Sequence, residues 1–254
     1  PGSSLQIDEN SGNIKDRKMG YYFADEEIFH KVTKETGAGR NRHPLTYMLE
    51  AADDLAYKTA DIEDSFVKGF IRYADLEREL KELEEKKRNG TFRPAYRLRQ
   101  LYERGIQKRV HDPESYAVKN WIVNAQGFLL NCATEGFMAN YDAIMSGKFG
   151  QDLFYGTNGE ELMELLGDMA DRYVFSSMAI YKMEVSESAV IDYLMERLVI
   201  SFISDNYKNA YRIQSEGKSE AEKLYLRLLL VTDYVCGMTD SYAKRLYQEM
   251  NGII

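Results

Sequence analysis

The sequence has 254 residues, of which 44% are hydrophobic and 29% are charged, and its formal net charge is -8. A chain of this length and composition can bury a sizeable core as one large domain or two small ones. The acidic balance excludes a protein that coats nucleic acid with a uniformly basic surface, and no apolar run is long enough to span a bilayer. The two cysteines, Cys132 and Cys236, lie far apart in apolar stretches, which is typical of reduced thiols. We therefore expect a cytoplasmic protein that is not bound to a membrane.

Helical periodicity runs through almost the whole chain, and Pro44, Pro94 and Pro113 fall at or near the starts of periodic segments. This pattern predicts an all-α protein, in which Tyr21-Tyr22-Phe23 allows one short extended piece. The expected helices, in chain order, cover residues 24–36, 44–70, 74–88, 94–109, 114–146, 158–173, 186–216, 219–232 and 233–250.

Three acids and a phenol share one face of the second expected helix: Asp53, Tyr57, Asp61 and Asp64. At about 100° per residue they lie within roughly 80° of one another, whereas Asp54 points away. Like charges at this spacing weaken a helix by a few tenths of a kcal/mol per pair unless a cation lies opposite them. A metal ion or a partner's arginine would supply that cation. The alternative is an ordinary acidic face in contact with water, although the helix is largely apolar around the acids.

The string from Glu50 to Tyr57 is E-A-A-D-D-L-A-Y, and Asp61 follows it. It resembles the helix that carries the last metal ligand in dGTPase-type deoxynucleoside triphosphate triphosphohydrolases, which are HD-domain phosphohydrolases. The resemblance implies an HD-domain-like helical bundle in which Asp53 binds the metal, while Tyr57 and Asp61 contact the deoxynucleotide. The spacing is consistent with these roles, because residues four apart lie on one face of a helix.

A second match lies at residues 233–243, where D-Y-V-C-G-M-T-D-S-Y-A resembles the closing segment of the same family. We expect a packed terminal helix here, with Gly237 permitting a close helix contact, and no catalytic role.

Two lysines are weaker matches. Lys18 precedes Gly20 and an aromatic pair, where the family aims a lysine at the triphosphate, and Arg17 is close enough to replace it. Lys182 falls where the family often has a basic residue. The alternative for each is an ordinary exposed side chain.

The upstream half of the family's metal site is missing. That site also needs a histidine and a His-Asp dipeptide ahead of the aspartate helix, and the sequence has three histidines, none of them suitably placed. His111-Asp112 lies downstream, directly before a proline, where Asp112 suits a helix N-cap. We interpret His30 and His43 as core or capping residues.

The resemblance therefore predicts an incomplete and inactive fragment. Residues 1–70 would be the end of the catalytic domain, and residues 71–254 a helical C-terminal region packed on it as one unit. In the complete enzyme, a divalent metal (Mg²⁺ or Mn²⁺) would assist hydrolysis of a dNTP, with dGTP favoured, to deoxynucleoside and triphosphate. The resemblance also implies assembly as a homo-oligomer, commonly a hexamer.

Two other functions remain open. The chain could be a non-catalytic helical interaction or oligomerisation module derived from the same scaffold. A magnesium-dependent pyrophosphohydrolase that used Glu50 and Asp53 is disfavoured, because the sequence has no second acidic motif at suitable spacing.

A basic segment at residues 86–109 has aromatic residues between its lysines and arginines, namely Phe92, Tyr96 and Tyr102. Such a segment could bind single-stranded nucleic acid through phosphate contacts and stacking. A contact with another subunit and a helix exposed to water are the alternatives.

Overall fold

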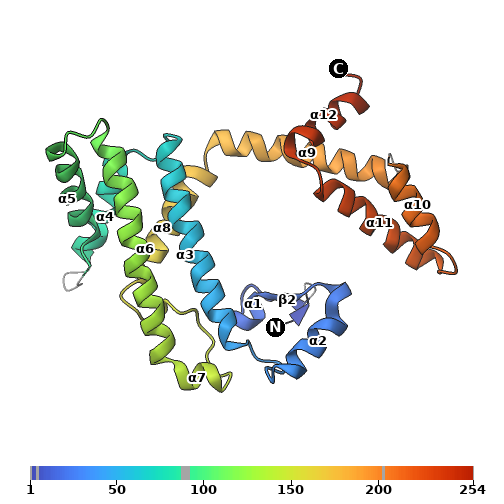
Figure 1. The fold of residues 1–254 in the computed structure, drawn as a ribbon, viewed down its shortest axis with the longest axis horizontal. Helices are drawn as coiled ribbons and strands as arrows, with labels where there is room; N and C mark the ends of the chain where they lie inside the picture. The colour runs from blue at the N-terminus through green and yellow to red at the C-terminus, as the bar shows by residue number, and fades with distance from the viewer. Residues whose placement is uncertain (1, 4–5, 87–91, 202–203, 254) are drawn as a thin grey trace. The chain divides into compact units, whose positions relative to one another are not determined.

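The computed structural model describes residues 2–3, 6–86, 92–201 and 204–253, and nearly all of its ordered elements are helices (Figure 1). The prediction of an all-α protein is confirmed. The chain divides into two compact units, Pro1–Phe175 and Ser176–Ile254. None of the helices in the described part of the chain has the length and apolar character needed to cross a membrane.

The first unit begins with short elements: β1 (Gly2–Ser3), α1 (Ile14–Arg17), β2 (Met19–Tyr21), the 3₁₀ turn η2 (Phe23–Asp25) and α2 (Glu26–Glu35). The two strands pair in parallel, and β2 overlaps the extended piece expected at residues 21–23. The Asn13 side chain caps α1, and the Ile14 N–H donates to the Gly150 carbonyl oxygen at 2.9 Å. This bond fastens the N-terminal segment to a loop much further along the chain.

The bundle of the first unit follows: α3 (Pro44–Val67), α4 (Tyr73–Lys86), α5 (Pro94–Gln107), α6 (Pro113–Ala139), α7 (Tyr141–Met145), α8 (Glu160–Ala170) and the π-helical turn η3 (Asp171–Phe175). Proline occupies the first turn of α3, α5 and α6, where its missing N–H costs no helical hydrogen bond. The long helices α3 and α6 pack against each other, and α8 packs on α3. Their shared core includes Ile62, Trp121 and Leu166, each fully buried.

The helix expected at residues 114–146 is interrupted at Asn140. Both the backbone N–H and the side-chain amide of Asn140 donate to the Gly136 carbonyl oxygen, which ends α6 before α7 begins. The loop after α7 then crosses α6 at Gly136, and a Cβ atom at that position would overlap the Leu153 carbonyl group. Leu153 and Phe154 are buried, so this loop is part of the core.

The second unit contains α9 (Met178–Ile200), α10 (Asp205–Gln214), α11 (Glu220–Cys236) and α12 (Asp240–Met250). Its own core includes Leu194, Leu198, Val231 and Leu246. The prediction of one helix over 186–216 is wrong, because α9 begins after its Ser177 cap and ends at Ser201, whose backbone is extended. The start of α11 is fixed by a capping box between Ser219 and Glu222.

The compact units do not divide at residue 70, where the sequence resemblance places the end of the catalytic part. The hydroxyl group of Thr59 on α3 accepts a hydrogen bond from Gln126 on α6 at 2.9 Å, and Lys58 donates to the Met163 carbonyl oxygen of α8 at 3.1 Å. Residues on both sides of position 70 therefore share one core. A functional division at that residue remains a proposal.

Candidate functional site

The helix α3 carries most of the predicted site, and local sequence sets both of its ends. The His43 Nδ1 atom accepts a hydrogen bond from the Leu45 N–H at 3.2 Å, and Pro44 supplies the first helical residue. At the other end Gly69 has a φ of 78°, a left-handed conformation in which glycine has no Cβ strain. The helix therefore ends at Val67, slightly short of the expected residue 70.

The predicted metal and nucleotide residues lie together on the face of α3 that turns away from the core. Asp53 is exposed and makes no hydrogen bond or ion pair to another described residue, and Tyr57 is 65% exposed. Asp61 is half-buried, and this burial, with the nearby Asp64 carboxylate, raises its pKa. The three side chains thus follow one another, a little more than one turn apart, along one accessible face.

Asp54 differs from its neighbour Asp53, as the helical spacing predicts. Its side chain is half-buried, and desolvation raises its pKa, while the positive charge of Lys18 acts in the opposite direction.

The same accessible face of α3 displays apolar side chains. Leu45, Leu49 and Val67 are 63%, 72% and 65% exposed, and Met48 is also exposed. Three exposed alanines separate them along the helix, namely Ala52, Ala56 and Ala60. A run of apolar side chains on an exposed surface marks a place where other groups bind, because isolated surface helices carry polar residues there.

A cluster of charged residues that the sequence interpretation missed lies at the start of this face. One Glu50 oxygen lies 2.6 Å from Arg42 Nη2, and its other oxygen lies 3.0 Å from Lys18 Nζ. The Arg42 side chain is only 5% exposed, and its Nη1 atom has no hydrogen-bond partner among the described residues. The sequence offers no signal for this cluster, because its members come from three separate stretches of chain.

The ion pair with Glu50 therefore holds Lys18 near the N-terminal part of α3, which precedes Asp53. Arg17, the alternative to Lys18, is the last residue of α1 and has no ion pair among the described residues. Lys182 is exposed on α9, which belongs to the second unit. Asp53, Tyr57, Asp61 and Lys18 thus belong to the first unit, and Lys182 belongs to the second.

The donor set for a metal ion is small. Within residues 2–3, 6–86, 92–201 and 204–253, no three His, Cys, Asp or Glu side chains are grouped so that they could hold an ion. A single carboxylate leaves most coordination positions to water. Asp53 can supply one ligand, but the described residues alone do not fit a complete metal centre.

Two of the three histidines lie at helix starts, and the third is exposed on α2. His43 caps α3, as expected, and Asp112 next to His111 caps α6 by accepting from the Ser115 N–H at 2.9 Å. The interpretation of His30 as a core or capping residue is wrong. Its side chain is 63% exposed on α2, which buries none of its described residues, and Nε2 lies 3.5 Å from a Glu26 oxygen.

Comparison with known proteins agrees with the family resemblance that the sequence of α3 indicates. Residues 156–249 match the family described as the phosphohydrolase-associated domain. Over its whole length the chain is 40% identical to the deoxyguanosinetriphosphate triphosphohydrolase-like proteins of Listeria monocytogenes and Listeria innocua, and it covers 58% of each. Over 94% of its length it is 28% identical to the deoxyguanosinetriphosphate triphosphohydrolase of Yersinia enterocolitica, of which it covers 55%.

Over its whole length the chain is therefore similar to deoxyguanosinetriphosphate triphosphohydrolase-like proteins. It spans a little over half the length of these relatives and corresponds to their C-terminal part.

The segment at residues 233–243, which resembles the family's closing segment, spans the end of α11, the turn after it and the start of α12. The Tyr207 hydroxyl group donates to Asp233 at 2.6 Å, and the Thr239 side chain caps α12 by accepting from the Tyr242 N–H at 3.2 Å. Gly237 ends α11, and a Cβ atom there would approach only the carbonyl oxygens of its own helix. Among the described residues the expected close helix contact at Gly237 is therefore wrong. The expected helix over 233–250 is also wrong at its start, because α11 continues to Cys236 and α12 begins at Asp240, although α12 packs through the buried Ala243 and Leu246.

The basic segment at residues 86–109 lies partly outside the described residues, because 87–91 are not described. Of its aromatic residues, Phe92 stacks on Phe128 with 4.1 Å between ring centroids, and Tyr102 packs on Tyr73 at 5.1 Å. Only Tyr96 is exposed among the three. Two of the rings proposed for base stacking are thus used in packing, and nucleic-acid binding by this segment stays a prediction.

Proposed function

We propose that this chain supplies the C-terminal part of a metal-dependent deoxynucleoside triphosphate triphosphohydrolase, which hydrolyses a dNTP, with dGTP favoured, to deoxynucleoside and triphosphate. The observation that carries the proposal is the accessible face of α3, where Asp53, Tyr57 and Asp61 follow one another. The similarity to proteins of that name over the whole chain supports it.

In this proposal the accessible face of α3 is covered in the complete protein by the part of the family that this chain does not span. The exposed Leu45, Leu49 and Val67 favour a protein contact over contact with water, since each exposes apolar area that burial would stabilise. The relatives are long enough to supply such a cover, because the chain spans only 58% of their length.

Each site residue has a defined part in the proposal. Asp53 supplies one carboxylate to a divalent cation, Mg²⁺ or Mn²⁺, whose other protein ligands come from the rest of the protein. The Tyr57 ring packs against the sugar, where a 2′-hydroxyl group would not fit, and Asp61 accepts a hydrogen bond from the nucleotide. Lys18 approaches the triphosphate, and Glu50 fixes its position. Lys182 is a second candidate for phosphate contact.

The proposal also includes assembly as a homo-oligomer of the hexameric type, and a cytoplasmic location. The alternative is a non-catalytic helical interaction module on the same scaffold. The exposed Leu45, Leu49 and Val67 of α3 are also consistent with that alternative, since they offer an apolar contact surface.

The test uses the longest natural product of the gene, assayed with dGTP and either metal for release of deoxyguanosine and inorganic triphosphate. Asp53→Ala should lower the rate at least about 100-fold, because it removes a ligand. Glu63→Ala, on the same helix but turned about 120° from Tyr57 and about 160° from Asp61, is the matched control and should retain activity. Release of pyrophosphate would contradict the proposed reaction, and an Asp53→Ala variant as active as the control would remove Asp53 from the site.

A further inference from the structure

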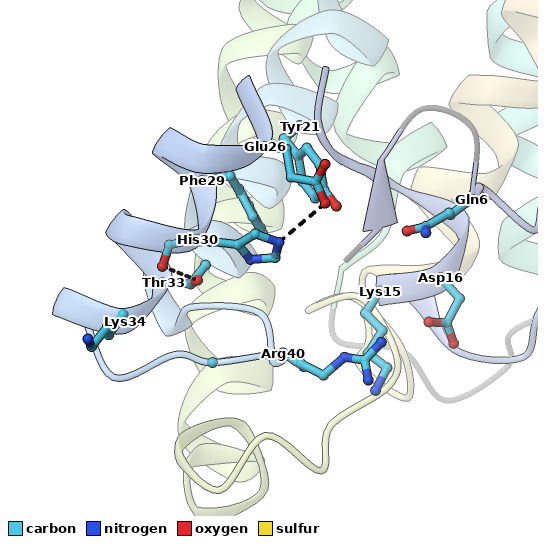
Figure 2. A pocket seen from close by; sticks show the side chains of 11 residues that line it. Gln6, Lys15, Asp16, Tyr21, Glu26, Phe29, His30, Thr33, Lys34 and Arg40 are labelled. Atoms are coloured by element: carbon cyan, nitrogen blue, oxygen red, sulfur yellow. Dashed lines mark hydrogen bonds and ion pairs between the residues drawn. The ribbon is translucent and has the colours of Figure 1, made fainter. Parts of the chain in front are cut away.

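A cavity lies in the first unit, apart from the accessible face of α3. Its volume is about 970 Å³, and Figure 2 shows side chains from α1, β2, α2 and the loop after α2 around it. Among the described residues that line it, none belongs to α3. A cavity of this size can accept a ligand as large as a nucleotide.

One side of the cavity is cationic. Lys15 and Arg40 point to the same place in Figure 2, and Lys34 on α2 is a third cation among the lining residues. None of the three has an ion-pair partner among the described residues. Two adjacent cations repel each other unless an anion lies between them, and a phosphate group accepts charge-assisted hydrogen bonds from both.

The opposite side is aromatic. The rings of Tyr21 and Phe29 stack with centroids 4.5 Å apart, and the His30 ring lies 5.8 Å from the first and 6.0 Å from the second (Figure 2). Most of the His30 side chain is exposed to the cavity and solvent. Such a cluster offers a flat surface on which a nucleobase can stack.

A carboxylate completes the aromatic side. Glu26 lies beside Tyr21 and His30 in Figure 2, with one oxygen 3.5 Å from His30 Nε2. A carboxylate can accept hydrogen bonds from the amino and ring N–H groups of a base. Asp16, the other acid that lines the cavity, accepts a hydrogen bond from Ser11 at 3.3 Å.

We propose that this cavity binds a nucleotide, with its base stacked on Tyr21, Phe29 and His30 and its phosphate between Lys15 and Arg40. A bare anion would use only the cations and would leave the rings and Glu26 without a role. A base with adjacent N–H donors, as in guanine, matches Glu26 best. This proposal does not rest on the function assigned to α3, because the two sites share no lining residue.

The experiment is a titration of the chain with GMP, followed through the ring protons of its histidines by NMR. The three histidines allow assignment with His30→Gln, and His111 serves as an internal reference. GMP has no triphosphate, so the result is independent of the proposed hydrolysis. We expect saturable shifts of the His30 signals and none for His111. Absence of a His30 shift at millimolar GMP would overturn the proposal.

Variants distinguish a nucleotide site from a general anion site. Arg40→Ala and Lys15→Ala should each weaken GMP binding about tenfold, because each loses a charge-assisted hydrogen bond to phosphate. Lys31→Ala, an exposed lysine of α2 that does not line the cavity, should bind as the unaltered chain does. Equal affinity for GMP and inorganic phosphate would contradict the base site, and so would unchanged GMP affinity in both cavity variants.

Discussion

The guanidinium group of Arg42 lies 2.6 Å from the carboxylate of Glu50, and the two side chains are only 5% and 13% exposed. Arg42 also lies over the Tyr47 ring, 4.7 Å from its centroid. Because Glu50 accepts from Lys18 with its other oxygen, one carboxylate joins the segment after β1, the residues before α3 and α3 itself.

Glu50→Gln should therefore destabilise the first unit by about 1–3 kcal/mol, since it leaves the buried Arg42 charge without its carboxylate. Urea unfolding followed by circular dichroism measures this change. Glu63→Gln is the control, because Glu63 lies on the same helix and has no ion-pair partner among the described residues. Equal unfolding midpoints for the two variants would show that the cluster does not stabilise the fold.

Asp61→Asn should stabilise the first unit slightly at neutral pH, by about 0.2–0.5 kcal/mol, because it removes the repulsion with Asp64. Burial raises the pKa of Asp61, so its charged form is less favourable in the folded than in the unfolded chain. This destabilisation is present above the folded pKa and disappears as pH falls below the unfolded value of about 3.9. Urea unfolding at pH 7 and pH 3 should show the difference only at the higher pH.

Glu79→Gln should destabilise the first unit at neutral pH, which is the opposite of the effect expected for Asp61→Asn. Arg172 donates two hydrogen bonds to Glu79, at 3.1 and 2.8 Å, and these lower the pKa of Glu79 despite its burial. The stabilisation is therefore complete above the unfolded pKa of about 4.3 and is lost as pH falls through the folded value. The variant should lose about 1–3 kcal/mol at pH 7 and much less in acid.

The matched control is Glu82→Gln on the same helix, where the side chain is exposed. If its pH profile of unfolding parallels that of Glu79→Gln, the Arg172 contact is not the cause.

Gly136→Ala should destabilise the first unit by about 1–3 kcal/mol, because the added methyl group would overlap the Leu153 carbonyl group. Gly127→Ala in the same helix meets no atom within 4 Å and should stabilise it by up to about 1 kcal/mol. Thermal unfolding of both variants measures the contrast. Opposite signs are expected, and a stabilised Gly136→Ala would show that the loop does not cross α6 at this point.

The helices and their starts were largely predictable because their signals are local. Pro44 and Asp112 act within one turn of the chain, and the spacing of Asp53, Tyr57 and Asp61 depends only on helical geometry. The breaks at Asn140 and Ser201 were missed, since apolar periodicity continues through both.

The Arg42 contact with Glu50 and the exposure of His30 could not be predicted from spacing. Both depend on where α2 and the segment before α3 lie against the helical bundle. A local sequence pattern does not give that tertiary position. The amphipathic pattern of α2 indicates one apolar face, yet the described residues of α2 bury none of it.

Helix α3 runs without interruption from its His43 cap to Val67. The direction in which each site side chain points therefore depends on how many residues separate it from the cap. Each residue added or removed between the cap and Asp53 would rotate all later side chains by about 100° around the helix axis. Such a change would move Asp53 off the accessible face even if every side chain were kept. Between its cap and Asp53 the helix should therefore tolerate no insertion or deletion of a single residue.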